Sequence, residues 1–85
     1  MLPALVSVFE MRAAEEKILK ALVELDQAVR DRQIGRKPDL GLLIARVDEL
    51  AERLPPDADP RLVHFLHRKS YEKARGWLEE RRLRG

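Results

Sequence analysis

The 85-residue sequence contains no cysteine. A chain without cysteine has no disulfide framework, no thiolate metal site and no thiol nucleophile, and it suits a reducing compartment. Glycine is also scarce, and the four glycines do not form the spaced motif that cradles a phosphate group. We therefore predict that the protein is not an enzyme and needs no cofactor.

Long apolar runs are missing as well. No run approaches the length of a membrane span, which requires about 18 consecutive apolar residues. Residues 1–9 are mostly apolar, yet they lack the basic flank and the small-residue cleavage site of a signal peptide. We therefore expect a soluble, cytoplasmic protein without a membrane partner.

Aromatic residues make up only 5% of the chain, whereas charged residues make up 38% and hydrophobic residues 45%. This balance argues against disorder and is typical of a charged helical bundle. The length favours a single domain that spans residues 1–85.

The net charge of +2 is too small to identify a partner, but its distribution is uneven. Residues 38–60 hold two basic and six acidic side chains, whereas residues 61–85 hold eight basic and three acidic ones. An acidic middle and a basic end attract each other, either within one chain or between copies.

The first helix is predicted over residues 7–33. Ser7 and Glu10 form a capping box, in which each side chain bonds the backbone amide of the other residue. Apolar residues then recur at spacings of three and four, with Glu15 at the one polar position of this stripe. Gly35 follows the last turn, where glycine commonly ends a helix.

The second helix is predicted over residues 39–54. Asp39 is placed to cap its first turn. Two prolines follow at positions 55 and 56, and proline does not continue a helix.

The third helix is predicted over residues 60–83, because Asp59 followed by Pro60 is a strong start signal. No segment shows the alternating pattern of a strand. The predicted fold class is therefore all-α, an antiparallel helix hairpin with a third helix packed on it.

The first predicted helix is longer than the second by roughly 16 Å at 1.5 Å per residue. The second helix therefore leaves part of the apolar stripe of the first helix uncovered. In a two-fold dimer, the first helix of a second copy would pack against this uncovered part. We expect a homo-oligomer that completes the bundle, with a dimer favoured over a higher oligomer. The candidate self-association residues are Leu5, Phe9, Ile18, Leu22, Leu25 and Val29.

Both histidines, His64 and His67, lie on one face of the third predicted helix. Two imidazoles three residues apart can share a metal ion, but a complete site needs a further ligand and the sequence indicates none. Ser70 and Tyr71 lie near His67, where a hydroxyl usually makes only a hydrogen bond. We therefore predict neither a metal site nor a catalytic residue.

The basic C-terminal segment is the better functional candidate. Its candidate contacts to another macromolecule are Arg68, Lys69, Lys73 and Arg75, although a solvated face that complements the acidic middle segment is the simpler explanation. We predict a helical protein-interaction and oligomerisation module without catalytic activity, with Trp77 as its main packing anchor. The alternative is a nucleic-acid-associated protein that uses the basic C-terminal helix.

The stretch Ser70–Leu78 resembles the second helix of a tetratricopeptide-type pair. In that family a tyrosine stands three residues before a small alanine, and a large apolar residue stands four after it, as Tyr71, Ala74 and Leu78 do here. The resemblance covers nine residues, and Arg81 departs from the next small position of the family pattern. What it implies is structural, namely two short helices with a break near residues 69–70.

Overall fold

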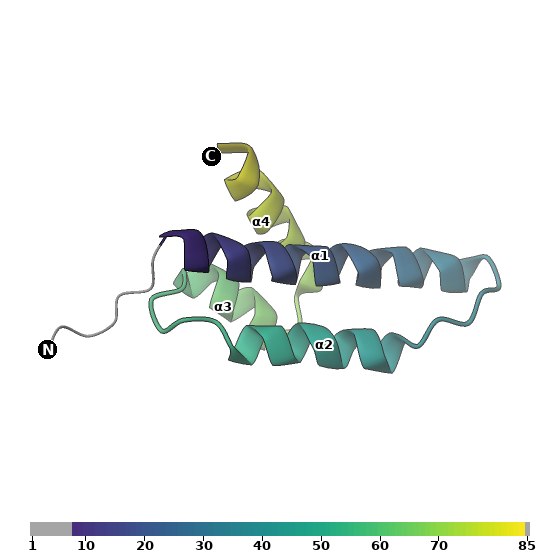
Figure 1. Cartoon of the computed structure of the whole chain (residues 1–85). Coiled ribbons are helices and arrows are strands. Elements are labelled where there is room, and N and C mark those ends of the chain that lie inside the picture. Colours follow the sequence, from purple (N-terminus) through teal and green to yellow (C-terminus); the bar gives the residue numbers. More distant parts are fainter. Residues whose placement is uncertain (1–7, 85) are drawn as a thin grey trace, which may run out of the picture.

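The computed structural model describes the backbone of residues 8–84 and the side chains of residues 10–84. Within these residues the chain forms four helices and no strand, so the all-α prediction is confirmed. None of the four helices is both long enough and apolar enough to cross a membrane. They are α1 (Val8–Gln33), α2 (Leu40–Glu52), α3 (Pro60–His67) and α4 (Tyr71–Arg84) (Figure 1).

The helices α1 and α2 form the predicted antiparallel hairpin, and a glycine turn ends α1 (Figure 1). Gly35 has a φ of 90°, and its amide donates to the Arg32 carbonyl at 3.2 Å. The Arg36 amide donates to the Asp31 carbonyl at 2.9 Å, which completes a Schellman motif. Glycine suits this position because a Cβ atom is strained at such a φ.

Aspartates cap α2 and α3 as predicted. The Asp39 carboxylate accepts a hydrogen bond from the Leu42 amide at 3.0 Å, and the Asp59 carboxylate accepts one from the Arg61 amide at 2.8 Å. The backbone bond from Arg61 holds the pKa of Asp59 below its ordinary value. The predicted Ser7 cap lies outside the described residues.

The prediction of one continuous third helix is wrong, because the chain breaks between residues 67 and 71. Lys69 lies in the left-handed region with a φ of 59°, and its amide donates to the Leu66 carbonyl at 3.2 Å. The Ser70 amide donates to the Phe65 carbonyl at 2.8 Å. These two bonds form a second Schellman motif, with a lysine where glycine is usual.

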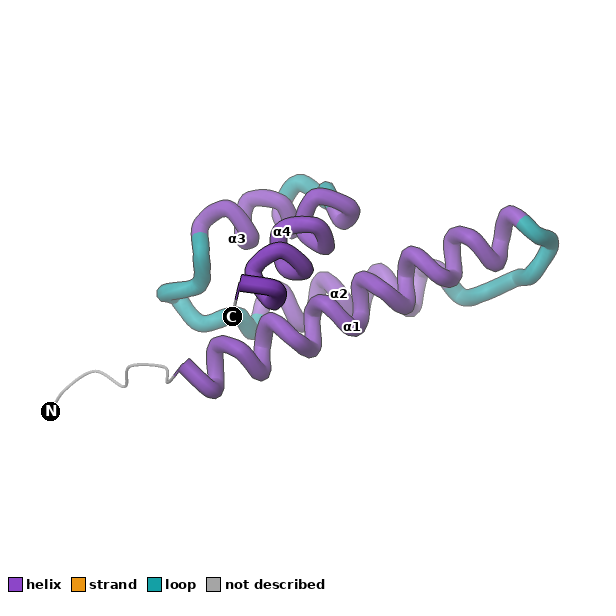
Figure 2. The backbone as a smooth tube through the Cα atoms, turned by 90° about the horizontal axis from the view of Figure 1, so that it is seen from above, coloured by secondary structure: helices purple, strands orange, loops and turns teal. Residues whose placement is uncertain are grey.

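The packing of the core explains why the chain breaks between α3 and α4. The short helix α3 buries Leu62 and Leu66, α4 buries Ala74 and Leu78, and both pairs join the same core. A straight helix would carry its second half past α1, whereas the turn brings α4 across α1 (Figure 2). The two short helices implied by the stretch Ser70–Leu78 are therefore confirmed.

The core draws on every helix. Ile18 of α1, Val47 of α2, Leu62 of α3 and Ala74 of α4 each have 0% of their surface exposed. Around them, Leu22 and further apolar side chains of the same helices complete one cluster. Helices α1 and α3 each pack against both α2 and α4, so all four helices share one core.

Replacing Lys69 with glycine is expected to stabilise the protein. A Cβ atom in the left-handed region costs roughly 1–2 kcal/mol, which outweighs the extra chain entropy of about 0.4–1 kcal/mol that glycine loses on folding. Lys69→Ala is the matched control, because it removes the same ion pair with Asp48 but keeps the Cβ atom. Urea unfolding should rank the glycine variant above the alanine variant, and equal stabilities would contradict a strained backbone at this position.

Candidate functional site

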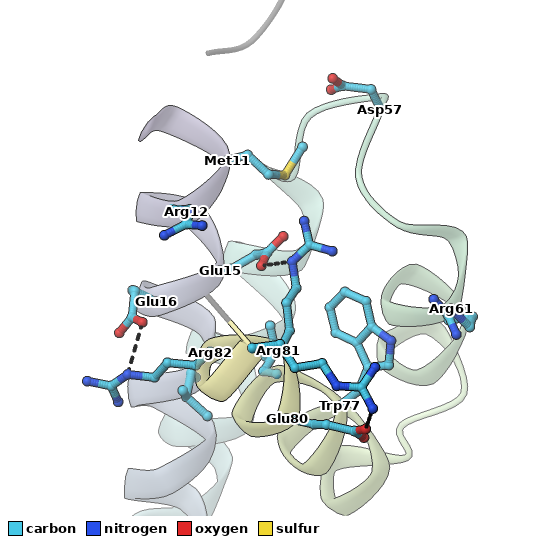
Figure 3. Close-up of a pocket in the computed structure, with 13 residues that line it drawn as sticks. Met11, Arg12, Glu15, Glu16, Asp57, Arg61, Trp77, Glu80, Arg81 and Arg82 are labelled. Carbon is cyan, nitrogen blue, oxygen red and sulfur yellow. Dashed lines mark ion pairs between the residues drawn. The ribbon is translucent and has the colours of Figure 1, made fainter. Parts of the chain in front are cut away.

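A groove opens between the N-terminal half of α1, the start of α3 and the C-terminal half of α4 (Figure 3). It has a volume of about 770 Å³. Leu19 and Leu78 are buried beneath it, Met11 and Trp77 are partly exposed in it, and charged side chains form most of its rim. A groove of this size and mixed lining suits a segment of a macromolecule or a small ligand.

Trp77 lies between two arginines in this groove (Figure 3). The guanidinium carbon of Arg81 is 5.3 Å from the centre of the indole ring, and that of Arg61 is 5.9 Å away. Both distances allow a cation–π interaction. Because Arg61 belongs to α3 and Arg81 to α4, the indole is held between side chains of two helices.

Glu15 anchors the same arginine from α1. Only 7% of Glu15 is exposed, and its carboxylate accepts a hydrogen bond from Arg81 Nε at 2.9 Å (Figure 3). Burial outweighs the opposing attraction of Arg81 and raises the pKa of the Glu15 carboxyl. Arg82 Nε lies 3.4 Å from a Glu16 carboxylate oxygen, so two ion pairs join α4 to α1 along the groove.

Replacing Glu15 with glutamine is expected to change how stability depends on pH. Because the pKa of Glu15 is raised on folding, the stability linked to its proton is full below the ordinary pKa and is lost as pH rises through the folded pKa. From about pH 4 to about pH 7, the wild type should therefore lose stability relative to Glu15→Gln. Urea unfolding of both proteins at the two pH values measures this, and parallel pH profiles would contradict it.

The four basic candidate residues divide into two pairs. Arg68 and Lys73 are exposed and form no ion pair among the described residues. Lys69 Nζ lies 2.6 Å from an Asp48 carboxylate oxygen, and this hydrogen bond raises the pKa of Lys69. The acidic middle of the sequence therefore meets its basic end within one chain at this point.

Arg75, like Lys69, has partners within the chain, and it forms two ion pairs where Lys69 forms one. Its guanidinium lies 2.7 Å from Glu79 and 2.7 Å from Asp26 of α1. Hydrogen bonds to Glu79 and Asp26 raise its pKa. Arg75 therefore holds α4 across α1, and half of the predicted basic contact set has partners inside the molecule.

The structure also locates the candidate self-association residues. Ile18, Leu22 and Leu25 are buried in the core of the single chain, so they are covered without a second copy. Val29 is 41% exposed. Leu5 and the Phe9 side chain lie outside the described part of the chain.

The two histidines are exposed on α3. Among residues 10–84 there is no group of three His, Asp or Glu side chains placed to hold a metal ion. The Tyr71 hydroxyl donates to the Asp48 carboxylate at 3.2 Å.

Sequence reasoning identified Trp77 but missed the groove around it. The partners Arg61, Arg81 and Glu15 are far apart in the sequence and meet only because α4 crosses α1. One signal was visible, namely Glu15 at the polar position of an otherwise apolar stripe.

Comparison with known proteins adds no relative: no family model, no curated protein and no solved structure matches this chain.

Proposed function

We propose that the protein is a helical interaction module that binds a segment of another protein in the groove between α1 and α4. The observation that carries the proposal is Trp77, the one tryptophan of the chain, which stays partly exposed between Arg61 and Arg81. Tryptophan and arginine are the residue types most enriched among side chains that dominate binding energy at protein interfaces.

The lining indicates the chemistry of the partner segment. The indole of Trp77 and the thioether of Met11 offer an apolar contact. Arg12 is exposed on the rim and forms no ion pair among the described residues, so it is available to a carboxylate. An amphipathic helix with one large apolar side chain next to an acidic residue meets both requirements.

A site-specific crosslinking experiment tests this proposal. A photo-crosslinking residue replaces Glu80 at the rim, and the matched control carries it at Lys20, which is exposed on α1 outside the groove. A partner captured from the host at position 80 is identified, purified and titrated while the fluorescence of Trp77 is followed. Capture at both positions, or no fluorescence change with the purified partner, would refute the proposal that the partner binds in the groove.

The nucleic-acid alternative is supported by the two free cations Arg68 and Lys73. Binding to a phosphate backbone would weaken steeply with salt and would fall on charge reversal at these two residues. Partner binding in the groove would not respond to Arg68→Glu with Lys73→Glu. The double variant therefore separates the two proposals.

Self-association is the second candidate function, and the exposure of Val29 favours it. This residue stands four positions before the end of α1, and Figure 2 shows that this end of α1 extends beyond α4. An apolar side chain there is available to a second copy, whereas Ile18 and Leu22 are not.

We expect a molar mass near twice the 9.9 kDa of one chain at micromolar concentration, measured by light scattering after size exclusion. Val29→Glu should return the protein to a monomer, because a carboxylate would be buried without a partner at the contact. A wild-type monomer, or a variant that remains a dimer, would argue against self-association through Val29.

A further inference from the structure

The turn between α1 and α2 exposes two large apolar side chains. We call residues 32–42 the hairpin tip; it lies at the end of the molecule away from the Trp77 groove (Figures 1 and 2). Ile34 is 73% exposed and Leu42 is 67% exposed. Neither contributes to the core, so folding of the chain alone does not account for them.

The same tip holds positive charge that no described residue neutralises. Arg32, Arg36 and Lys37 are exposed and form no ion pair among the described residues. Elsewhere the described arginines are mostly paired: those of α4, for example, contact Asp26, Glu15 and other carboxylates.

The tip keeps a net charge of +2, because Asp39 is the one acidic residue among residues 32–42. The Asp31 carboxylate, just before the tip, accepts a hydrogen bond from the Gln27 side-chain amide at 3.1 Å, and the Asp39 carboxylate caps α2. The Gly35 turn and the Asp39 cap also fix the backbone, so the apolar and basic side chains are presented on a defined turn. Little ordering is therefore needed before this surface binds.

We propose that the hairpin tip binds the surface of an anionic lipid bilayer. Ile34 and Leu42 enter the boundary between headgroups and acyl chains, while Arg32, Arg36 and Lys37 meet the anionic headgroups. This proposal departs from the expectation that the protein has no membrane partner. The contact it describes is peripheral, and none of the described helices could span a membrane.

Shape and chemistry together favour a bilayer over other anionic partners. The tip projects from the end of the hairpin, and a protein partner would need a matching hollow to cover it (Figure 2). A nucleic acid would satisfy the three cations but would leave Ile34 and Leu42 largely in water. A bilayer accepts both kinds of side chain in the same contact.

The test measures partitioning of the full chain onto vesicles by co-sedimentation. We expect binding to phosphatidylcholine vesicles that contain phosphatidylserine, weaker binding at high salt and none to phosphatidylcholine alone. Absence of binding to the anionic vesicles would overturn the proposal, whatever other anionic partner the chain then proves to bind.

Two tip variants and two matched controls locate the contact. The charge variant carries serine at Arg32, Arg36 and Lys37, and its control removes three charges at the exposed Lys17, Lys20 and Lys73. The apolar variant carries Ile34→Ser with Leu42→Ser, and its control carries Val63→Ser with Leu83→Ser.

Each tip variant should lower the partition coefficient by about tenfold or more, and each control by less than about twofold. If the charge variant and its control lose binding to the vesicles equally, the net charge of the whole molecule drives the attraction to the bilayer, and the assignment of the contact to the tip is overturned. An apolar variant that binds like the wild type would overturn insertion. All substituted residues are exposed, and circular dichroism confirms that the variants remain folded.

Discussion

Replacing Leu62 with alanine is expected to lower the free energy of unfolding by about 2–5 kcal/mol. Leu62 has 0% of its surface exposed and belongs to a core cluster to which all four helices contribute, so its truncation leaves a cavity in that core. In a domain of this size each kcal/mol shifts the melting temperature by roughly 4–8 °C. The variant should therefore melt at least about 10 °C below the wild type, or fail to fold.

The neighbouring Val63 provides the control for this substitution. It follows Leu62 in α3 but is exposed, so Val63→Ala removes two methyl groups with little loss of packing. We expect its stability to stay within about 0.5 kcal/mol of the wild type. Urea unfolding followed by circular dichroism measures both variants, and similar losses in the two would mean that Leu62 is not at the centre of the core.

Replacing Trp77 with alanine is the second substitution with a large expected effect, and it acts on both stability and binding. The indole packs against the core cluster and between Arg61 and Arg81, yet it is partly exposed. We expect a loss of about 1–3 kcal/mol, below the 3–5 kcal/mol typical of fully buried large aromatics. The melting temperature should fall by several degrees while the protein remains folded.

Binding is the readout that separates the two roles of Trp77. If the groove is the docking site, Trp77→Ala should weaken the complex with the partner by about tenfold or more at a temperature where the variant is folded. Trp77→Phe keeps an aromatic ring in place and should retain most of the stability. A partner that binds Trp77→Ala as tightly as the wild type would exclude the indole as the anchor.

The helix boundaries were largely predictable because they depend on local chemistry. The caps at Asp39 and Asp59 and the stop at Gly35 use hydrogen bonds and backbone angles within a few residues. The break at Lys69 was harder, because lysine carries no particular preference for the left-handed region. Only the short resemblance over Ser70–Leu78 indicated it, and tertiary packing of α4 on α1 enforces it.

The groove could not be derived from the sequence because it depends on that break. A continuous third helix gives no reason to bring Arg81 to Glu15 or Arg75 to Asp26, which lie more than forty residues apart in the chain. The assignment of Arg75 as a surface contact failed to anticipate its internal partners for the same reason. Trp77 was recognisable alone, as a rare large side chain among charged ones.

The unequal cover along α1 has a consequence for motion. Helix α1 packs against α2 and α4, and its end before Gly35 extends beyond α4 (Figure 2). Local unfolding at the Gly35 end therefore breaks fewer contacts than global unfolding and leaves the Glu15–Arg81 pair intact. The groove at Trp77 therefore keeps its shape if the Gly35 end of α1 opens, whereas the hairpin tip binds in its closed, hydrogen-bonded form, so the two ends of one continuous helix respond independently.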